Sequence, residues 1–401
     1  MHILIIPSWY PQFSGDIGGS FFREQAIALR KAEYQVGVIY PQIRSLKNIK
    51  SILKKPYGLT VEDDEGVNTI RWYAVNFIPK NKKYNKSHWI KIALKLFETY
   101  VEQFGKPDII HVHSMLYAGF AAQLLSEKYG IPYVVTEHSL IPLDEISSLK
   151  QVASDAKACI AVSNEFSSLL NKLFETQKWT YISNIVNDEF ISFEKTLDTE
   201  EYFTFITVCF LEKKKRVDLL ISSFAKAFKD NKKVRLKIGG DGILMSELKI
   251  LAKELGVESQ VIFLGKLSRQ QVKEEMALSN AFVLSSEYET FGVVLVEALA
   301  LGKPVIATKC GGPESIVVPE VGYLISKNSE REMANGLLEL HQNWNKFDSV
   351  QIRQYCLENF SEQAVVEKLT KIYTEPNCSN EKKNNFRLCF RSNRFWIFRV
   401  D

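Results

Sequence analysis

Two glutamates, Glu289 and Glu297, lie eight residues apart in the segment SSEYETFGVVLVEALALGKPVIAT (285–308). We expect Glu297 on an apolar helix over about 293–301, and Glu289 in the loop that enters it. An ionised carboxylate that is buried without a partner is costly, so both groups should be paired or face a ligand. Eight residues of helix rise about 12 Å, which is too far for an acid–base pair on one bond and suits two parts of one long ligand. The alternative is an amphipathic helix with a solvated Glu297, which the flanking apolar residues disfavour.

This segment resembles the retaining glycosyltransferase family 4, whose members have the α/β fold called GT-B. The resemblance rests on the Glu-x7-Glu spacing in ETFGVVLVE, on the ALALGKPVIAT that follows and on GGPESI (311–316), and it covers nearly the whole chain. It implies two Rossmann-like domains facing a central cleft. It also implies that a nucleoside diphosphate sugar is a substrate, and that no cofactor or metal is needed.

The resemblance assigns roles to five positions around the two glutamates. Glu297 should accept hydrogen bonds from the ribose hydroxyls of the nucleotide sugar, and Glu289 should lie near the sugar ring. The backbone of three residues should approach the sugar hydroxyls and the diphosphate, namely Phe291, Gly292 and Val293. The residue types agree with these roles, because a carboxylate accepts from paired hydroxyls and a helix N-terminus suits an anion.

Lys215, in VCFLEKKKRVDLL, offers a fixed cation for the negative charge that develops on a leaving diphosphate. The family normally has Gly-Arg-Leu after the preceding strand, and in this chain Phe210 replaces the arginine. The basic neighbours that are candidates to compensate are Lys213, Lys214 and Arg216. The alternative for Lys215 is a solvated basic turn.

Gly18 and Gly19 follow the first expected strand and permit the backbone to approach a ligand closely. The resemblance places this loop against the donor phosphates and the acceptor, whereas an ordinary turn before a helix is the alternative. GGDG (239–242) also suggests a phosphate loop, but we favour a turn that ends a strand.

Three histidines follow expected strands of the amino-terminal half. His138, in VVTEHS, ends a strand on the cleft side, and the resemblance gives the matching histidine a supporting role at the reaction centre, with a structural histidine as the alternative. We expect His111 and His113, in HVHS, to face opposite sides of their strand. His113 and Glu137 are our candidates for acceptor binding. A metal site is not expected, because no third ligand has a suitable spacing.

EDDE (62–65) resembles the Asp-x-Asp metal motif of the other large glycosyltransferase fold. It lies between GLTV and GVNTIRWY, which predicts a hairpin turn rather than a metal site.

Strand and helix patterns alternate along the chain, which predicts mostly parallel, doubly wound sheets. In the first half we expect a helix at 20–31 and strands at 2–6, 36–40, 108–113, 132–138 and 157–163. The pattern then restarts with a helix at 216–228 and strands at 202–208, 234–240, 260–265, 280–286 and 303–308. Capping boxes are expected at Ser268 and Ser329. Ligands of such sheets bind beyond the carboxyl ends of the strands.

We therefore predict an amino-terminal Rossmann-like acceptor domain over 1–186 and a nucleotide-sugar-binding domain over 187–359. A helix at about 360–376 should return to the first domain, and a basic aromatic tail occupies 377–401.

The composition, with 46% hydrophobic residues and a formal net charge of +4 over 401 residues, is that of a soluble globular protein and does not indicate nucleic acid as a partner. Six cysteines without CxxC spacing disfavour a zinc site or a disulfide framework and fit a reducing cytosol. No run approaches the roughly 20 apolar residues that span a bilayer. The start MHILIIPSWYP does not resemble a signal peptide.

Two segments suit an anionic membrane surface. PKNKKYNKSHWIKIALK (79–95) places lysines beside Tyr84 and Trp89, and a solvated surface helix is the alternative. The tail suits an interfacial amphipathic anchor, or equally an extension without a role. We therefore expect a cytoplasmic protein that can bind peripherally to the inner face of the plasma membrane.

The sequence thus predicts a metal-independent retaining glycosyltransferase for surface polysaccharide synthesis, such as lipopolysaccharide or capsule. It would move a sugar from a UDP- or GDP-sugar to a saccharide or a polyprenyl-linked saccharide. Lys215 would stabilise the leaving group, His138 would position the sugar and Glu289 would hold its hydroxyls. The alternatives are a GT-B sugar-nucleotide epimerase and a nucleotide-sugar-binding protein without turnover. An NAD enzyme is disfavoured, because no GxGxxG follows the first strand.

Overall fold

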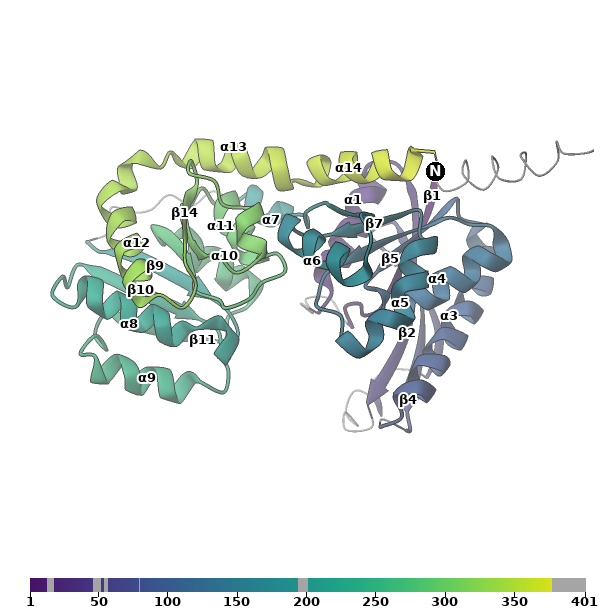
Figure 1. The fold of residues 1–401 in the computed structure, drawn as a ribbon, viewed down its shortest axis with the longest axis horizontal. Coiled ribbons are helices and arrows are strands. Elements are labelled where there is room, and N and C mark those ends of the chain that lie inside the picture. The colour runs from purple at the N-terminus through teal and green to yellow at the C-terminus, as the bar shows by residue number, and fades with distance from the viewer. Residues whose placement is uncertain (13–17, 46–51, 54–56, 79, 194–200, 377–401) are drawn as a thin grey trace, which may run out of the picture.

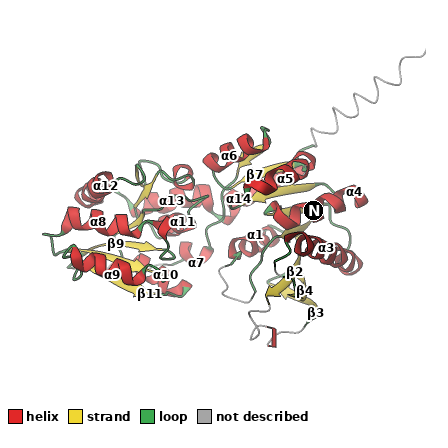
Figure 2. Cartoon of the chain, turned by 60° about the horizontal axis from the view of Figure 1, so that its bottom comes forward, coloured by secondary structure: helices red, strands yellow, loops and turns green. Residues whose placement is uncertain are grey.

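The computed structural model of this chain describes residues 1–12, 18–45, 52–53, 57–78, 80–193 and 201–376. Two α/β lobes lie side by side, and two consecutive helices, α13 (Ser349–Phe360) and α14 (Glu362–Thr374), run along the top of both lobes (Figure 1). In each lobe helices lie on both sides of a central sheet, as Figure 2 shows. The tail at 377–401, for which we considered a membrane anchor, is outside the described residues.

The first lobe contains an eight-stranded sheet with the order β3-β4-β2-β1-β5-β6-β7-β8. Its strands are β1 (His2–Pro7), β2 (Gln35–Ser45), β3 (Gly58–Asp64), β4 (Val67–Asn76), β5 (Ile109–His113), β6 (Tyr133–Glu137), β7 (Ala158–Ala161) and β8 (Trp179–Tyr181). Neighbouring strands pair in parallel except β3 and β4, which form an antiparallel hairpin.

Alternate residues of β1 pack against different helices, because successive side chains of a strand point to opposite faces. Ile3 and Ile5 share a core with α1 (Ser20–Lys31) and α14, whereas Leu4 and Ile6 face α3 (Lys82–Phe104) and α4 (Met115–Tyr129). The remaining helices of this lobe are α5 (Leu143–Asp155), α6 (Asn164–Phe174) and the short α7 (Asp188–Ile191). All six residues of β1 are buried, as expected for a central parallel strand.

The second lobe contains a parallel six-stranded sheet with the order β11-β10-β9-β12-β13-β14. Its strands are β9 (Phe203–Val208), β10 (Val234–Gly239), β11 (Val261–Gly265), β12 (Ala281–Leu284), β13 (Val305–Thr308) and β14 (Gly322–Ile325). Its helices are α8 (Val217–Phe228), α9 (Met245–Glu254), α10 (Arg269–Ala277), α11 (Val293–Ala300) and α12 (Glu330–Asn343), with the 3₁₀ turns η1 (Lys213–Lys215), η2 (Gly312–Ser315) and η3 (Trp344–Lys346). The expected strands and helices of both halves are confirmed, with boundaries within a few residues of those predicted.

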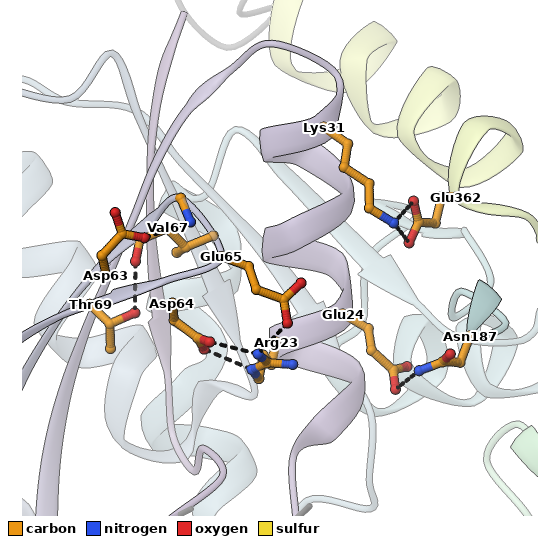
Figure 3. Close-up of polar contacts among 11 residues, drawn as sticks. Arg23, Glu24, Lys31, Asp63, Asp64, Glu65, Val67, Thr69, Asn187 and Glu362 are labelled. Carbon is orange, nitrogen blue, oxygen red and sulfur yellow. Dashed lines mark hydrogen bonds and ion pairs between the residues drawn. The ribbon is translucent and has the colours of Figure 1, made fainter. Parts of the chain in front are cut away.

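The last helix packs on the first lobe. Val365, Leu369 and Tyr373 of α14 lie in the same core as α1 and β1. Lys31 at the end of α1 donates to Glu362 at a distance of 2.8 Å (Figure 3). Helix α14, which follows the second lobe in the sequence, therefore completes the core of the first lobe.

Two local predictions have different outcomes. The capping box at Ser268 is confirmed, with reciprocal bonds between Ser268 and Gln271. The capping box at Ser329 is only half correct: Ser329 accepts from the Glu332 N–H, but the Glu332 carboxylate accepts from the Ser326 N–H instead. The N–H of Ser326, which follows β14, competes with the cap for that carboxylate.

The EDDE segment forms the predicted hairpin between β3 and β4. Arg23 donates to Asp64 at 2.6 Å and to Glu65 at 2.9 Å, and the Asp63 carboxylate accepts from the Gly66 N–H within the turn (Figure 3). Asp64 and Glu65 therefore hold the hairpin against α1, and Asp63 stabilises its turn.

Candidate active site

Lys215 and Glu289 meet beyond the carboxyl ends of β9 and β12. Lys215 Nζ lies 2.5 Å from Glu289 Oε1, and the two side chains are 19% and 16% exposed. Ser286 Oγ donates to the same carboxylate oxygen at 2.7 Å. The structure thus brings together two of the predicted residues and adds a serine that the sequence reasoning missed, although SSE immediately after a strand was a usable signal.

Hydrogen bonds fix the backbone around this ion pair. Ser285 Oγ donates to the Lys215 carbonyl at 2.8 Å, and Thr308 Oγ1 donates to the Ser286 carbonyl at 2.6 Å. The end of β13 is thereby joined to the end of β12 and to η1. The lysine and the glutamate are held by elements far apart in sequence, so their approach does not depend on one flexible loop.

The GGPE segment after β13 braces the Glu289 backbone. Glu289 N–H donates to the Cys310 carbonyl at 3.0 Å, and Gly312 N–H donates to the Glu289 carbonyl at 2.7 Å. A Cβ at Gly312 would lie 2.1 Å from the Phe291 carbonyl oxygen, so only glycine permits this approach. Gly311 has φ +118°, a conformation that also favours glycine.

The N-terminus of α11 follows Glu289 directly. Its N-cap is Gly292, with φ 102° and no side chain to cap the helix, and Val293 is the first helical residue. Phe291 is 3% exposed and packs on Phe360, with ring centroids 6.1 Å apart. The first-turn N–H groups therefore have no side-chain acceptor, and the helix dipole favours an anion there.

Glu297 lies on α11 and is 5% exposed, so the alternative of a solvated glutamate is wrong. Its Oε1 lies 3.4 Å from Nη1 of Arg269, the first residue of α10. Burial raises the pKa of Glu297 to about 7, and the nearby Arg269 charge opposes that rise. Glu297 is thus a buried carboxyl with one cationic partner, as the sequence argument required.

The prediction that His111 and His113 face opposite sides of their strand is wrong. Residues two apart in a strand lie on the same face, and the two rings stack with centroids 4.4 Å apart. His113 Nδ1 in turn lies 3.0 Å from His138 Nε2 at the end of β6. The three histidines therefore form one cluster across β5 and β6.

The histidine cluster is neutral and enclosed. Burial lowers the pKa values of His111 and His138 to about 3, and that of His113 well below its ordinary value. His111 uses both ring nitrogens, toward Tyr373 Oη at 2.6 Å and Thr136 Oγ1 at 2.7 Å. The sequence reasoning missed Tyr373, because it lies on α14, 262 residues away.

Aromatic residues of α1 cover the cluster. The ring of Phe22 lies 4.7 Å from those of His113 and His138, and the ring of Phe21 lies 4.9 Å from that of His138. His138 is 6% exposed. The structure thus brings the predicted His113 and His138 together, under the helix that follows Gly18 and Gly19.

Glu137 has a different environment from the one we expected. Its carboxylate accepts from the Ser114 hydroxyl and from the N–H groups of Met115, His138 and Ser139, at distances of 2.7 to 3.4 Å. These donors lie at the N-terminus of α4 and in the loop after β6. Acceptor binding by Glu137 stays a prediction, and the observed bonds give it a structural role.

Gly19 precedes α1 with φ +79°, and a Cβ there would lie 3.1 Å from the Trp9 ring and 3.3 Å from the Trp9 carbonyl. Glycine at this position thus serves close packing as well as any approach to a ligand. Gly18 is exposed beside it, and residues 13–17 of the same loop are outside the described residues.

Two of the three basic residues beside Lys215, namely Lys214 and Arg216, pair with other side chains. Lys214 lies 3.2 Å from Glu212, and Arg216 binds Asp218 and Asn328. Phe210, which replaces the arginine of the family, is 59% exposed. In this structure the cation beside Glu289 is Lys215.

Comparison with known proteins places both lobes in one group. Residues 18–190 match the profile described as Glycosyltransferase Family 4, and residues 188–355 match the one described as Glycosyl transferases group 1. N-acetyl-alpha-D-glucosaminyl L-malate synthase of Bacillus anthracis is 30% identical over 310 residues, which are 71% of this chain and 78% of that protein. A Bacillus subtilis protein assigned to teichuronic acid biosynthesis as the glycosyltransferase TuaC is 27% identical over 359 residues, 84% of this chain and 88% of that one.

Solved structures show the same architecture. HepE of Anabaena in complex with UDP superimposes with a TM-score of 0.68 at 19% identity, over 92% of this chain and 99% of that chain. With the two profile matches and the Bacillus anthracis relative, the chain therefore belongs to glycosyltransferase family 4 and has the GT-B fold.

Proposed function

We propose that the protein is a retaining glycosyltransferase that moves a sugar from a nucleoside diphosphate sugar to a saccharide acceptor in surface polysaccharide synthesis. The observation that carries the proposal is the Lys215–Glu289 pair at the uncapped N-terminus of α11, with Glu297 buried further along the same helix. Three anion- or hydroxyl-binding groups thus lie on or beside one helix, α11, which suits an elongated sugar nucleotide.

The diphosphate lies, in this proposal, between Lys215 and the first turn of α11. When the bond between the sugar C1 and the diphosphate oxygen breaks, the electron pair stays on that oxygen. Lys215 and the helix N–H groups stabilise the resulting charge. These groups supply the positive charge, so the proposal is metal-independent.

The acceptor hydroxyl forms the new bond to C1 on the face that the diphosphate leaves, and its proton passes to the departing diphosphate. Glu289 holds sugar hydroxyls and is not the nucleophile. His138, neutral at physiological pH, offers hydrogen bonds to the sugar without adding charge. Because the acceptor replaces the diphosphate on the same face, the product keeps the anomeric configuration of the donor.

We favour UDP as the nucleotide over GDP, because the HepE structure of the same fold contains UDP. The surface-polysaccharide assignment draws on the TuaC relative, which is assigned to teichuronic acid biosynthesis. A polyprenyl-linked saccharide is the acceptor class that we infer for such a pathway.

We also infer that the first lobe binds anionic lipid near the start of α3. Before and within the first turn of α3, Phe77, Ile78 and Tyr84 are 68%, 48% and 44% exposed, among several lysines. Leu143, at the start of α5, is 76% exposed and follows the strand that ends beside His138. A membrane bound there would present a lipid-linked acceptor near the histidine cluster. Trp89 does not contribute, because it is buried with 5% exposure.

Within the described ranges no helix is both long and apolar enough to cross a bilayer.

Calorimetric titration with UDP, GDP and ADP, each with and without EDTA, tests the donor site. We expect micromolar binding of UDP that EDTA does not change and that Glu297→Ala abolishes. Glu297→Gln keeps the shape of the buried side chain and separates loss of binding from loss of folding, which circular dichroism checks. If none of the three nucleotides binds, the proposal is wrong.

A further inference from the structure

One guanidinium joins the two lobes beside Glu297. Arg269 Nη1 lies 3.4 Å from Glu297 Oε1, and Arg269 Nη2 lies 3.2 Å from Oε1 of Glu24 on α1. The Glu297 and Glu24 side chains are only 6% and 15% exposed. The arginine therefore bridges a carboxylate of the second lobe and a carboxylate of the first.

Glu24 is held from a second side by the segment between the lobes. Asn187, the N-cap of α7, donates its side-chain N–H to Glu24 Oε1 at 2.9 Å (Figure 3). The Arg269 guanidinium lies over the ring of Phe190 on the same short helix, 5.4 Å from its centroid. Four segments, α1, α7, α10 and α11, thus meet at this arginine.

The chain offers a second contact between the lobes for comparison. Ser315 Oγ of η2 donates to Glu165 Oε2 of α6 at 2.7 Å, and the Asn164 N–H donates to Ser315 Oγ at 2.9 Å. The Glu165 contact joins the same two lobes, but among the described residues it does not connect to Lys215, Glu289 or Glu297. The Glu24 contact, by comparison, is linked to Glu297 through the side chain of Arg269.

We propose that Arg269 is a positioning residue that couples occupancy of the donor site to closure of the two lobes. Its ion pair with Glu297 lies on the Oε1 side of the carboxylate, which leaves Oε2 for a ribose hydroxyl. Its bond to Glu24 transmits that orientation to α1, whose Phe21 and Phe22 cover the histidine cluster. This inference rests on the proposed function, in which Glu297 accepts from the ribose.

The physical basis is that both carboxylates share one cation in a largely buried place. Removal of the arginine leaves Glu297 buried without its cation, so the carboxyl would stay protonated to a higher pH and lose the negative charge that strengthens its bonds to ribose hydroxyls. Removal of the Glu24 charge leaves Glu297 paired but separates the first lobe from the pair. Because coupling between two equilibria is reciprocal, weaker closure must also weaken nucleotide binding.

The test is a double-mutant cycle on UDP affinity, with Glu24→Gln, Arg269→Gln and the pair, and with Glu165→Gln as the matched control. We expect Glu24→Gln to weaken UDP binding by about tenfold, although Glu24 lies in the other lobe, and Arg269→Gln to weaken it by about 100-fold. In the Arg269→Gln background, Glu24→Gln should have no further effect. Glu165→Gln should leave the affinity within about twofold of wild type.

Small-angle X-ray scattering supplies a readout that does not depend on nucleotide binding. Without nucleotide, Glu24→Gln and Arg269→Gln should both increase the radius of gyration relative to wild type and to Glu165→Gln. UDP binding that Glu24→Gln leaves unchanged, or effects of the two substitutions that simply add, would overturn this inference alone. Failure of the wild type to bind any nucleotide would overturn the proposed function and the coupling together, and scattering would then show whether the bridge between lobes remains.

Discussion

The two lobes place their polar clusters at equivalent points but stabilise them differently. Beyond β9 and β12, Lys215 and Glu289 form an ion pair that remains partly open to solvent. Beyond β5 and β6, His111, His113 and His138 are nearly fully buried and carry no charge at physiological pH. The same strand-edge geometry thus supports one charged cluster and one neutral cluster.

The difference matches what each side of a sugar transfer needs. Negative charge develops on the diphosphate, and the lobe with Lys215 has a cation and an uncapped helix N-terminus to receive it. The sugar and the acceptor carry hydroxyls, for which neutral donors and acceptors are sufficient. The comparison therefore predicts that substitutions in the charged cluster affect turnover most, and that substitutions in the neutral cluster affect stability and its pH dependence.

The largest effect is expected for Lys215→Met. Loss of the cation that faces the departing diphosphate should lower kcat/KM for the UDP-sugar by about 10²- to 10³-fold, measured as UDP release in a coupled assay. Lys214→Met is the matched control, because Lys214 pairs with Glu212 and its side chain is 62% exposed. Equal losses in both variants would show that Lys215 contributes only to general positive charge. The special role of the charged cluster in turnover would then be wrong.

The pH dependence of the free energy of unfolding is the second test. The buried histidines and Glu297 contribute to it with opposite signs. His111 and His138 have lowered pKa values, so the unfolded chain takes up their protons below pH 6.5, and each should cost about 2 kcal/mol at pH 5. His113 acts in the same direction. Glu297 has a raised pKa, so it adds stability at low pH that is lost as the pH rises from about 4.5 to 7.

Urea denaturation of wild type and Glu297→Gln at pH 7.5 and pH 5 separates these contributions. The wild type should lose stability at pH 5, and Glu297→Gln should lose about 2 to 3 kcal/mol more, because it lacks the compensating carboxyl. Identical pH dependence in the two proteins would mean that Glu297 titrates normally. Unchanged wild-type stability between the two pH values would contradict the burial of neutral histidines.

Tyr373→Phe should have the smallest of these effects. It removes the hydroxyl that binds His111 Nδ1 and leaves a buried ring nitrogen unpaired, so the free energy of unfolding should fall by about 1 to 2 kcal/mol. Nucleotide affinity should stay that of the wild type. Tyr34→Phe is the control on the same helix α14, because Tyr34, between α1 and β2, binds Thr370 of α14 in a half-buried place. No loss of stability in the Tyr373 variant would show that the histidine cluster does not depend on α14.

The sequence allowed prediction of the charged cluster better than the neutral one, for a physical reason. Glu289, Gly292 and Glu297 occupy one short segment, so their spacing already limits how far apart they can lie, whereas Lys215 was assigned from the family motif after the preceding strand. The strand and helix pattern that supports them was also predictable from the sequence, because the sheet of the second lobe is parallel and its strands are largely buried runs of apolar residues.

The neutral cluster and the Arg269 bridge join residues that are distant in the chain. Tyr373 reaches His111 across 262 residues, and Arg269 reaches Glu24 across 245. Such contacts depend on how helices pack on the sheet, which local patterns do not specify. The orientation of His111 and His113 was different: the two-residue period of a strand was sufficient to place them on one face, and our inference from it was wrong.

The configuration of the product distinguishes a retaining transferase from an inverting enzyme and from an epimerase. The protein would be incubated with α-linked UDP- and GDP-sugars and with polyprenyl-linked or soluble saccharide acceptors, and the new linkage would be assigned by NMR from its one-bond C–H coupling. We predict an α-linked product together with one equivalent of free nucleoside diphosphate, with and without EDTA. A β-linked product would contradict the retaining mechanism, and an altered sugar nucleotide formed without any acceptor would identify an epimerase instead.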